Sequence, residues 1–230
     1  MTPASRQLAF DLAHRSAQGL EDFLVSGSNA AAVDLIDRWP QWPHWAAIVV
    51  GPEGAGKSHL AHVWRTRSGA PVLAASALTD AVPGRLEEAR ALLVEDIDRG
   101  ISSERILFHL MNIARDLKLS ILLTSRTAPG DIGVKLPDLA TRLIACPQVR
   151  IDEPDEALLK AVLVKLFADR QLAVEPHVVN HIALHMERSM SAANRIVAAA
   201  DRIALEQQRR VTRAVAAEAL ARVGAGGEEA

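Results

Sequence analysis

The sequence has little cysteine, no long apolar run and no excess of positive charge, and each shortage excludes a class of protein. Cys146 is the single cysteine among 230 residues, so no internal disulfide can form, which is typical of a reducing cytoplasm. No stretch approaches the roughly 20 apolar residues of a membrane span. Residues 1–15 contain no apolar run long enough for a signal peptide. We therefore expect a cytoplasmic protein without a membrane partner.

The balance of charge argues against a protein that coats DNA by itself. Lysine and arginine number 26 against 28 acidic residues, for a formal net charge of −2, whereas DNA-coating proteins are usually basic. The tryptophans lack the interleaved basic residues of a base-stacking surface, so we interpret Trp39, Trp42, Trp45 and Trp64 as packing of a connector against the sheet. The eight histidines show no metal-ligand spacing. Any contact with DNA is expected to be indirect, through a partner.

Short apolar runs alternate with amphipathic segments in the first two thirds of the chain. Helices are expected from Lys57 onwards and over residues 104–117. The runs that predict buried strands are residues 46–50, 71–75, 91–95 and 120–124, with a further signal at residues 148–151. This alternation predicts an α/β fold with a parallel sheet.

After Asp152 the pattern becomes helical. Pro154 and Pro176 each begin a segment with apolar residues at helical spacing, and two further helices follow. We therefore divide the chain into an N-terminal peptide (1–20), an α/β nucleotide-binding domain (21–152), a small all-helical domain (153–223) and a disordered tail (224–230).

The stretch GPEGAGKS, residues 51–58, meets the pattern G-x-x-x-x-G-K-[ST] in full. Its glycines let backbone N–H groups turn inward around a phosphate, and the next helix adds partial positive charge at its N-terminus. Lys57 is expected to reach the β- and γ-phosphates of ADP or ATP, and Ser58 to bind Mg²⁺. The nucleotide-binding residues predicted here are Gly51, Pro52, Gly54, Ala55, Gly56, Lys57, Ser58 and His59.

Two other predicted strands end in polar residues. Glu95 and Asp96 follow the run ALLV, where carboxylates can hold the waters of Mg²⁺ and Asp96 can orient an attacking water. The alternative is a polar strand end at the surface. Glutamate before aspartate is an unusual order for such a strand end, so we expect slow intrinsic hydrolysis. Thr124 and Ser125 end the run SILLTS, where a hydroxyl can sense the γ-phosphate or simply cap a loop.

A phosphate cradle, an acidic strand end, a polar strand end and a helical lid, in this order, form the plan of the AAA+ ATPases. The sequence resembles the DnaA/Hda family among them. The segment EDFLVSGSNAAAVDLI (21–36) resembles the family's segment that closes over adenine, LPDLATRL (136–143) resembles its arginine-finger stretch, and residues 150–186 resemble its lid. The chain lacks the DNA-reading domain and the long N-terminal domain of DnaA, so it is most similar to the Hda members, which inactivate DnaA.

The resemblance implies that Arg142 is an arginine finger, which completes the nucleotide site of a neighbouring subunit. A planar guanidinium suits the charge spread over phosphate oxygens. The alternative is a surface arginine, whose removal would change stability by about 0.5 kcal/mol or less. The lid arginine that faces the nucleotide in this family aligns with Ser191. Arg195 or Arg188, each about one helical turn away, substitutes for it, or this sensor is lost.

The N-terminal sequence RQLAFDL is similar to the Q-L-x-[LF]-x-L peptide with which Hda docks on the DNA polymerase sliding clamp. An extended peptide of this kind binds a groove through a few alternate apolar anchors and one orienting amide. The predicted clamp-binding residues are Gln7, Leu8, Phe10 and Leu12. The alternative is a tail that packs on its own domain or has no role.

The sequence therefore predicts a negative regulator of replication initiation. Tethered to the clamp on DNA, it supplies Arg142 to stimulate hydrolysis of DnaA-bound ATP, with weak ATPase activity of its own at most and possible self-assembly. One alternative is a self-contained AAA+ ATPase or loader. The other is a non-enzymatic DnaA-like adaptor, for which the N-terminal peptide would matter and Arg142 would not.

Overall fold

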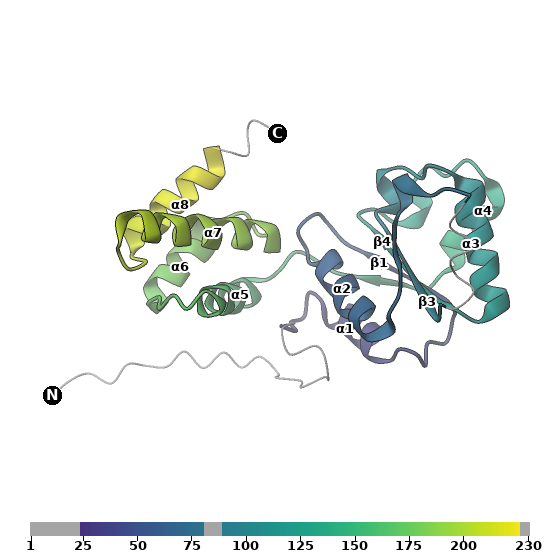
Figure 1. The fold of residues 1–230 in the computed structure, drawn as a ribbon, viewed down its shortest axis with the longest axis horizontal. Helices are drawn as coiled ribbons and strands as arrows, with labels where there is room; N and C mark the ends of the chain where they lie inside the picture. Colours follow the sequence, from purple (N-terminus) through teal and green to yellow (C-terminus); the bar gives the residue numbers. More distant parts are fainter. Residues whose placement is uncertain (1–23, 81–88, 226–230) are drawn as a thin grey trace. The chain divides into compact units, whose positions relative to one another are not determined.

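The computed structural model describes residues 24–80 and 89–225, which form two compact units (Figure 1). One is an α/β unit of residues 29–152. The other is a helical unit of residues 24–28 together with residues 153–225. Gln7, Leu8, Phe10 and Leu12, the predicted clamp-binding residues, lie outside the described residues. Within those residues, no helix combines the length and the apolar character needed to cross a membrane.

The α/β unit is built on a five-stranded parallel sheet, as the alternation of apolar runs predicts. The strand order is β2-β3-β4-β1-β5, so the sheet centre is formed by strands distant in the sequence. The strands are β1 (Ala46–Val50), β2 (Val72–Ala74), β3 (Ala91–Glu95), β4 (Ser120–Ser125) and β5 (Gln148–Arg150). Every residue of β1 is buried, which explains why this strand is continuously apolar.

The register of the strands brings the carboxyl ends of β1, β3 and β4 together at one edge of the sheet. Val50 of β1 lies opposite Ser125 of β4, and Val94 of β3 lies opposite Leu123 of β4. Strand β4 thus separates the loop after β1 from the acidic end of β3. Thr124 and Ser125, at the end of β4, therefore lie between the two.

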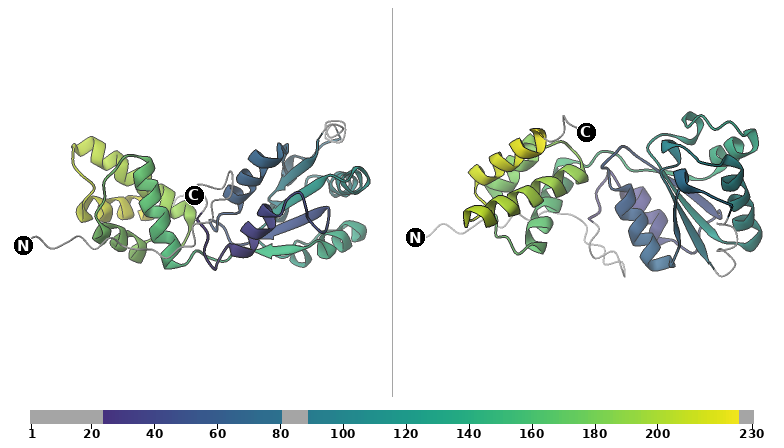
Figure 2. Two further views of the ribbon diagram at one scale, coloured as in Figure 1. Left: turned by 90° about the horizontal axis from the view of Figure 1, so that it is seen from below. Right: turned by 45° about the horizontal axis from the view of Figure 1, so that its top comes forward.

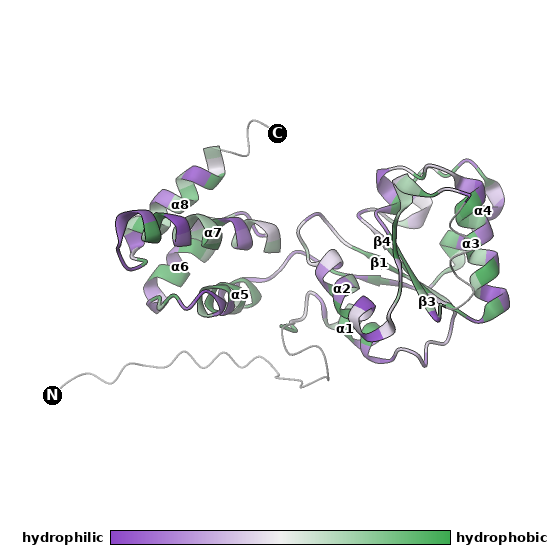
Figure 3. Ribbon diagram, in the orientation of Figure 1, coloured by the Kyte–Doolittle hydropathy of each residue, from purple (hydrophilic) through white to green (hydrophobic). Residues whose placement is uncertain are grey.

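Two helices cover each face of the sheet (Figures 1 and 2). Helices α1 (Ala30–Asp37) and α2 (Lys57–Ser68) lie on one face, and α3 (Glu104–Leu117) and α4 (Pro137–Ala145) lie on the other. Helix α3 begins where Ser103 accepts a hydrogen bond from the Ile106 backbone N–H, and its apolar side is buried on the sheet. Figure 3 shows hydrophobic residues along much of the central strands and both hydrophilic and hydrophobic residues on the helices that flank the sheet.

Trp39, Trp42 and Trp64 pack together at helix α2, whereas Trp45 packs against the core of the sheet. Trp64 of α2 is fully buried, with the Trp42 ring stacked on it at 5.4 Å and the Trp39 ring edge-on at 6.0 Å. Arg67 of the same helix donates to backbone carbonyls at the end of α1 and beyond it, including that of Trp39 at 2.8 Å. Packing is the predicted role of these side chains, and the partner of Trp39 and Trp42 is α2, the helix that follows the phosphate loop.

The helical unit has its own apolar core, to which four helices contribute. These are α5 (Glu156–Asp169), α6 (Pro176–His185), α7 (Met190–Gln207) and α8 (Arg213–Ala225). Helix α5 does not begin at Pro154, as the sequence suggests, because Asp155 caps it by accepting the Leu158 backbone N–H at 2.7 Å. Ser189 caps α7 in the same way.

Candidate functional site

The loop between β1 and α2 has the backbone of a phosphate cradle. A side chain at Gly51 would overlap with the backbone carbonyl of Ile151. Gly54 and Gly56 have φ values of 73° and 106°, which side chains other than glycine rarely adopt. Gly56 is the N-cap of α2, so the free N–H groups of the first helical turn adjoin the loop. The glycine spacing in the sequence therefore reflects a real constraint on the backbone.

Lys57 supplies the positive charge of this cradle. Its side chain is 7% exposed, and its Nζ donates to the backbone oxygens of Gly51 at 2.7 Å and Pro52 at 2.8 Å. Burial lowers the pKa of this ammonium, although Asp96 and Asp98 act in the opposite direction. The lysine thus lies against its own loop, where a bound phosphate chain would meet it.

The remaining loop residues lie where the motif predicts. Ala55 is buried and fixes the loop against the unit, while Pro52 is half-buried. Ser58 and His59 are exposed in the first turn of α2. An exposed serine hydroxyl directly after the lysine is open to a metal ion that also contacts phosphate.

The acidic end of β3 contains a backbone feature that the sequence does not reveal. Asp96 adopts a left-handed conformation, with φ 58° and ψ 50°, which is uncommon for residues other than glycine, although asparagine and aspartate adopt it more often than most. The Oγ1 atom of Thr124 holds it there by accepting the Asp96 backbone N–H at 3.0 Å. Burial and the neighbouring Asp96 raise the pKa of Glu95, against the opposing effect of Arg65 and His62 in α2. The two carboxylates thus occupy different electrostatic environments.

These residues fit a metal that is shared with a nucleotide. In the described part of the chain, no group of three or more His, Cys, Asp or Glu side chains could hold a metal ion by themselves. Mg²⁺ typically uses one or two carboxylates together with substrate phosphates and water. Ser58, Glu95 and Asp96 therefore fit a metal that arrives with phosphate.

The two hydroxyls at the end of β4 are buried, and each forms a hydrogen bond within the protein. Thr124 braces Asp96, as described above. Ser125 donates from Oγ to the backbone oxygen of Thr127 at 2.6 Å, and its own backbone oxygen accepts the Gly51 N–H at 3.1 Å. The Thr124 side chain thus links β4 to the acidic end of β3, and the Ser125 backbone links it to the phosphate loop. Their sensing of a γ-phosphate stays a prediction.

The sequence analysis did not identify a group of four charged residues at this edge of the sheet, called here the charged edge: Glu53, Asp98, Arg99 and Arg126. Arg126 donates from Nε to Asp98 Oδ2 at 2.7 Å, and its backbone N–H donates to Asp98 Oδ1 at 2.9 Å. Its Nη1 also reaches Oε2 of Glu53, in the phosphate loop, at 3.3 Å. Arg99 Nη2 lies 3.5 Å from the same Glu53 oxygen. The sequence offers one indication of this group, which is nearness to the predicted site residues. Glu53 lies within the phosphate loop, Asp98 and Arg99 lie just after Asp96, and Arg126 follows Ser125.

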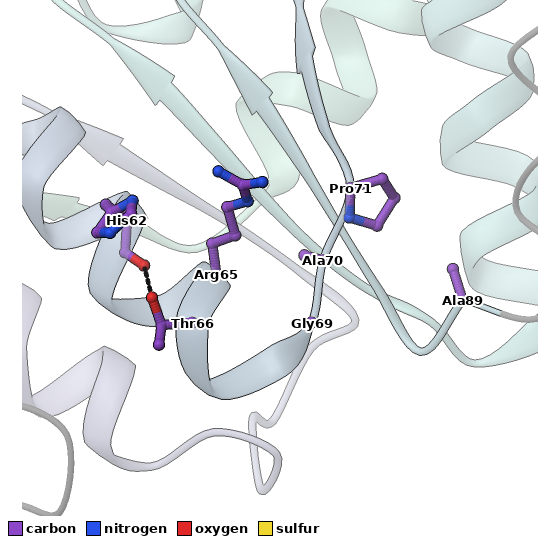
Figure 4. Close-up of a pocket in the computed structure, with 7 residues that line it drawn as sticks. All are labelled: His62, Arg65, Thr66, Gly69, Ala70, Pro71 and Ala89. Atoms are coloured by element: carbon purple, nitrogen blue, oxygen red, sulfur yellow. Dashed lines mark hydrogen bonds between the residues drawn. The ribbon is translucent and has the colours of Figure 1, made fainter.

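A hollow near α2 lies away from this edge (Figure 4). It adjoins the C-terminal half of α2 and the segments just before β2 and β3, so it is near the amino ends of these strands. The residues that line it are His62, Arg65, Thr66, Gly69, Ala70, Pro71 and Ala89. Because the phosphate loop follows the carboxyl end of β1, this hollow is not part of the cradle.

Arg142 lies on α4, with α3 on the face of the sheet opposite α2 (Figure 1). Its guanidinium carbon is 4.7 Å from the centre of the Phe108 ring of α3. In the described part of the chain, no carboxylate forms an ion pair with it. Glu104, one turn before Phe108, accepts the backbone N–H groups of Lys135 and Leu136, and so ties the start of α4 to α3.

The predicted lid arginines belong to the helical unit. Arg195 donates from Nη1 to Ser191 Oγ at 3.2 Å, and its Nη2 lies 3.6 Å from Glu187. Ser191 thus holds the arginine one turn further along α7, and contact of either residue with a nucleotide stays a prediction. Cys146, elsewhere in the α/β unit, is buried, with an exposed fraction of 4%.

The fold resembles those of solved structures of DnaA and RuvB. Domain III of the replication initiation protein DnaA from Thermotoga maritima matches with a TM-score of 0.75 and 19% identity, over 87% of this chain and 94% of that one. AMPPCP-bound DnaA from Aquifex aeolicus matches with a TM-score of 0.65 and 17% identity, over 81% and 64%. The Thermotoga maritima RuvB Holliday junction branch migration motor gives a TM-score of 0.64 and 18% identity, over 76% and 60%.

At the level of sequence the similarities are weaker. No protein-family model matches the chain. An uncharacterised protein of Haemophilus influenzae is 25% identical over 175 residues, which is 70% of this chain and 75% of that protein. The similarity to DnaA domain III extends over both units, and the chain therefore shares the fold of that domain, with its α/β unit built on a parallel sheet.

Proposed function

We propose that this chain is a DnaA-related regulator that binds ADP or ATP with Mg²⁺ at the cradle of residues 51–58. In this proposal the bound nucleotide sets the regulator's state, and hydrolysis of that nucleotide is slow. The glycine backbone, the buried Lys57 and the exposed Ser58 support nucleotide binding. So does the fold, because the similar DnaA of Aquifex aeolicus is described with bound AMPPCP.

The regulator acts on ATP bound to DnaA, to which it supplies Arg142. The observation that carries this step is the position of Arg142 on α4, across the sheet from the helix of its own cradle. An arginine held by an aromatic face, with no carboxylate partner in the described residues, keeps its five donors for phosphate oxygens. An arginine supplied in trans can accelerate phosphoryl transfer by roughly 10³- to 10⁵-fold.

The N-terminal peptide tethers the regulator to the sliding clamp on DNA. Gln7, Leu8, Phe10 and Leu12 provide the amide and the alternate apolar anchors that such a groove accepts. Tethering raises the local concentration of Arg142 near DNA-bound DnaA. DnaA then loses its ATP, and repeated initiation of replication is repressed.

The test is hydrolysis of radiolabelled ATP preloaded on DnaA, in the presence of clamp loaded on DNA. The unmodified protein should accelerate hydrolysis, and Arg142→Ala and Arg142→Lys should both abolish the acceleration while still binding clamp. Lysine fails because it keeps the charge but lacks the planar fork. Arg115→Ala, at an exposed arginine of α3, is the matched control and should behave like the unmodified protein.

The outcomes separate the proposal from its alternatives. Turnover by the purified chain alone, dependent on Lys57 and Asp96, would favour a self-contained ATPase. Clamp and DnaA binding without any effect of Arg142→Ala on hydrolysis would favour an adaptor.

A further inference from the structure

Glu53, in the middle of the phosphate loop, is held between two arginines. Its Oε2 lies 3.3 Å from Nη1 of Arg126 and 3.5 Å from Nη2 of Arg99. An anion bridged by two guanidinium groups is the arrangement with which proteins bind a phosphate oxygen. In this structure the anion is a carboxylate of the loop itself.

Arg126, the first of these arginines, is held in position by Asp98. Asp98, whose side chain is 5% exposed, accepts both the backbone N–H and the Nε of Arg126. These bonds leave the terminal nitrogens of the guanidinium directed at the loop. Arg126 is therefore preorganised, whereas Glu53, with a side chain that is 72% exposed, is the weakly held member of the pair.

Both arginines adjoin the phosphate loop through Glu53. Arg126 follows β4 and Arg99 follows β3, at the sheet edge that faces the loop. Lys57, which reaches the β- and γ-phosphates in such loops, is electrostatically coupled to both Arg126 and Glu53. A diphosphate would end near Lys57, and only a triphosphate would extend towards the arginines.

We propose that Arg126 and Arg99 bind the terminal phosphate of a nucleoside triphosphate, and that Glu53 competes with that phosphate for them. This rests on the proposed function only in that the cradle binds nucleotide. Entry of a triphosphate displaces the Glu53 carboxylate from the two arginines, while a diphosphate leaves it in place. The loop thereby carries a built-in bias against triphosphate.

Titration calorimetry with Mg²⁺ and either AMPPCP or ADP tests this proposal. Glu53→Gln keeps the shape of the side chain but removes its charge. It should tighten AMPPCP binding by roughly fivefold and change ADP binding by less than about twofold. Arg126→Gln should weaken AMPPCP binding by roughly tenfold or more, because it removes hydrogen bonds to a charged group, and should alter ADP binding far less.

Competition is separated from simple repulsion by the double variant. If Glu53 acts by occupying Arg126, the gain from Glu53→Gln shrinks when it is made in the Arg126→Gln background. If Glu53 only repels the phosphate, that gain stays the same or grows, and the competition model is wrong.

Matched controls come from exposed pairs elsewhere. Glu206→Gln removes another exposed glutamate that lies 3.5 Å from an arginine, and Arg115→Gln removes another paired arginine. Both should leave the two affinities unchanged, and thermal melting should show that each variant is folded. If Glu53→Gln changes the affinities for AMPPCP and ADP equally, or changes neither, the inference is wrong, but the proposal that the cradle binds nucleotide still stands. Failure of the unmodified protein to bind either nucleotide overturns both.

Discussion

Asp98 is the residue on which the charged edge depends. Its nearly buried carboxylate accepts two hydrogen bonds from one residue, Arg126, through the backbone and the side chain. Burial alone would raise the pKa of Asp98, but the hydrogen bonds from Arg126 outweigh this effect and lower the pKa. The ionised form is therefore the one that the folded protein stabilises.

Asp98→Asn should lower the free energy of unfolding by about 1–3 kcal/mol near pH 7, because an amide accepts fewer and weaker bonds from Arg126. A carboxyl with a lowered pKa adds stability above its unfolded pKa of about 3.9 and loses it as the pH falls through the folded value. The difference between unmodified protein and variant, measured by urea unfolding, should thus be constant from pH 5 to 8 and shrink below about pH 4. Asp116→Asn, at an exposed acid beside Arg115, should show no such difference. A pH-independent difference would contradict the role of ionised Asp98.

A second prediction at the scale of single residues concerns the reactivity of the Cys146 thiol. Burial raises the pKa of its thiol to about 11, with a small opposing effect of Arg142. At pH 8 only about one thiol in a thousand is then ionised, against roughly a quarter for an ordinary cysteine of pKa about 8.5. The folded protein should therefore react with a disulfide reagent at least a hundredfold more slowly than the guanidinium-unfolded chain. Rapid reaction of the folded protein would show that Cys146 is accessible.

At the scale of elements, α3 determines where α4 lies. The Glu104 carboxylate accepts the Leu136 N–H at 2.7 Å and the Lys135 N–H at 3.0 Å, and Phe108, one turn later, contacts Arg142. Positions four residues apart share one helix face, so one side of α3 holds both the start of α4 and its arginine.

Glu104→Ala should cost about 1–3 kcal/mol of unfolding free energy, because two backbone donors lose a charged acceptor. Hydrogen exchange of the amides of residues 135–140 should also become faster than in the unmodified protein. Arg105→Ala, at the next and exposed position of α3, is the control and should change neither quantity. Unchanged exchange in Glu104→Ala would mean that α4 is fixed by its apolar contacts alone.

The elements themselves were largely predictable, because their signals are local. Apolar runs located the strands, and helical periodicity located the starts of α2, α3, α5 and α6, to within about two residues, while the glycine motif located the cradle. The charged edge was not predictable in this way. Arg126 meets Asp98 and Glu53 across 28 and 73 residues, and this meeting depends on a strand order that the sequence does not state. The left-handed backbone at Asp96 likewise depends on Thr124, a residue of another strand.

On the scale of the whole molecule, the proposal assigns three tasks to separate parts of the chain. Residues 51–58 bind nucleotide, Arg142 contacts the partner's nucleotide, and the N-terminal peptide holds the clamp. Binding through a tether adds no contact to the reaction itself. It multiplies the local concentration of Arg142, with effective concentrations that reach the millimolar range for short linkers.

Variants of the N-terminal peptide and of Arg142 should therefore depend differently on protein concentration in their stimulation of hydrolysis. The double substitution Leu8→Ala and Phe10→Ala should reduce stimulation of DnaA-bound ATP hydrolysis by roughly tenfold or more at nanomolar concentrations, and micromolar protein should restore it. Arg142→Ala should not recover at any concentration, because it removes a group that contacts the reacting phosphate. Full rates measured at nanomolar concentration for the peptide variant would contradict tethering. Failure of that variant to recover at micromolar concentration would mean that residues 8 and 10 contribute to the reaction and not only to local concentration.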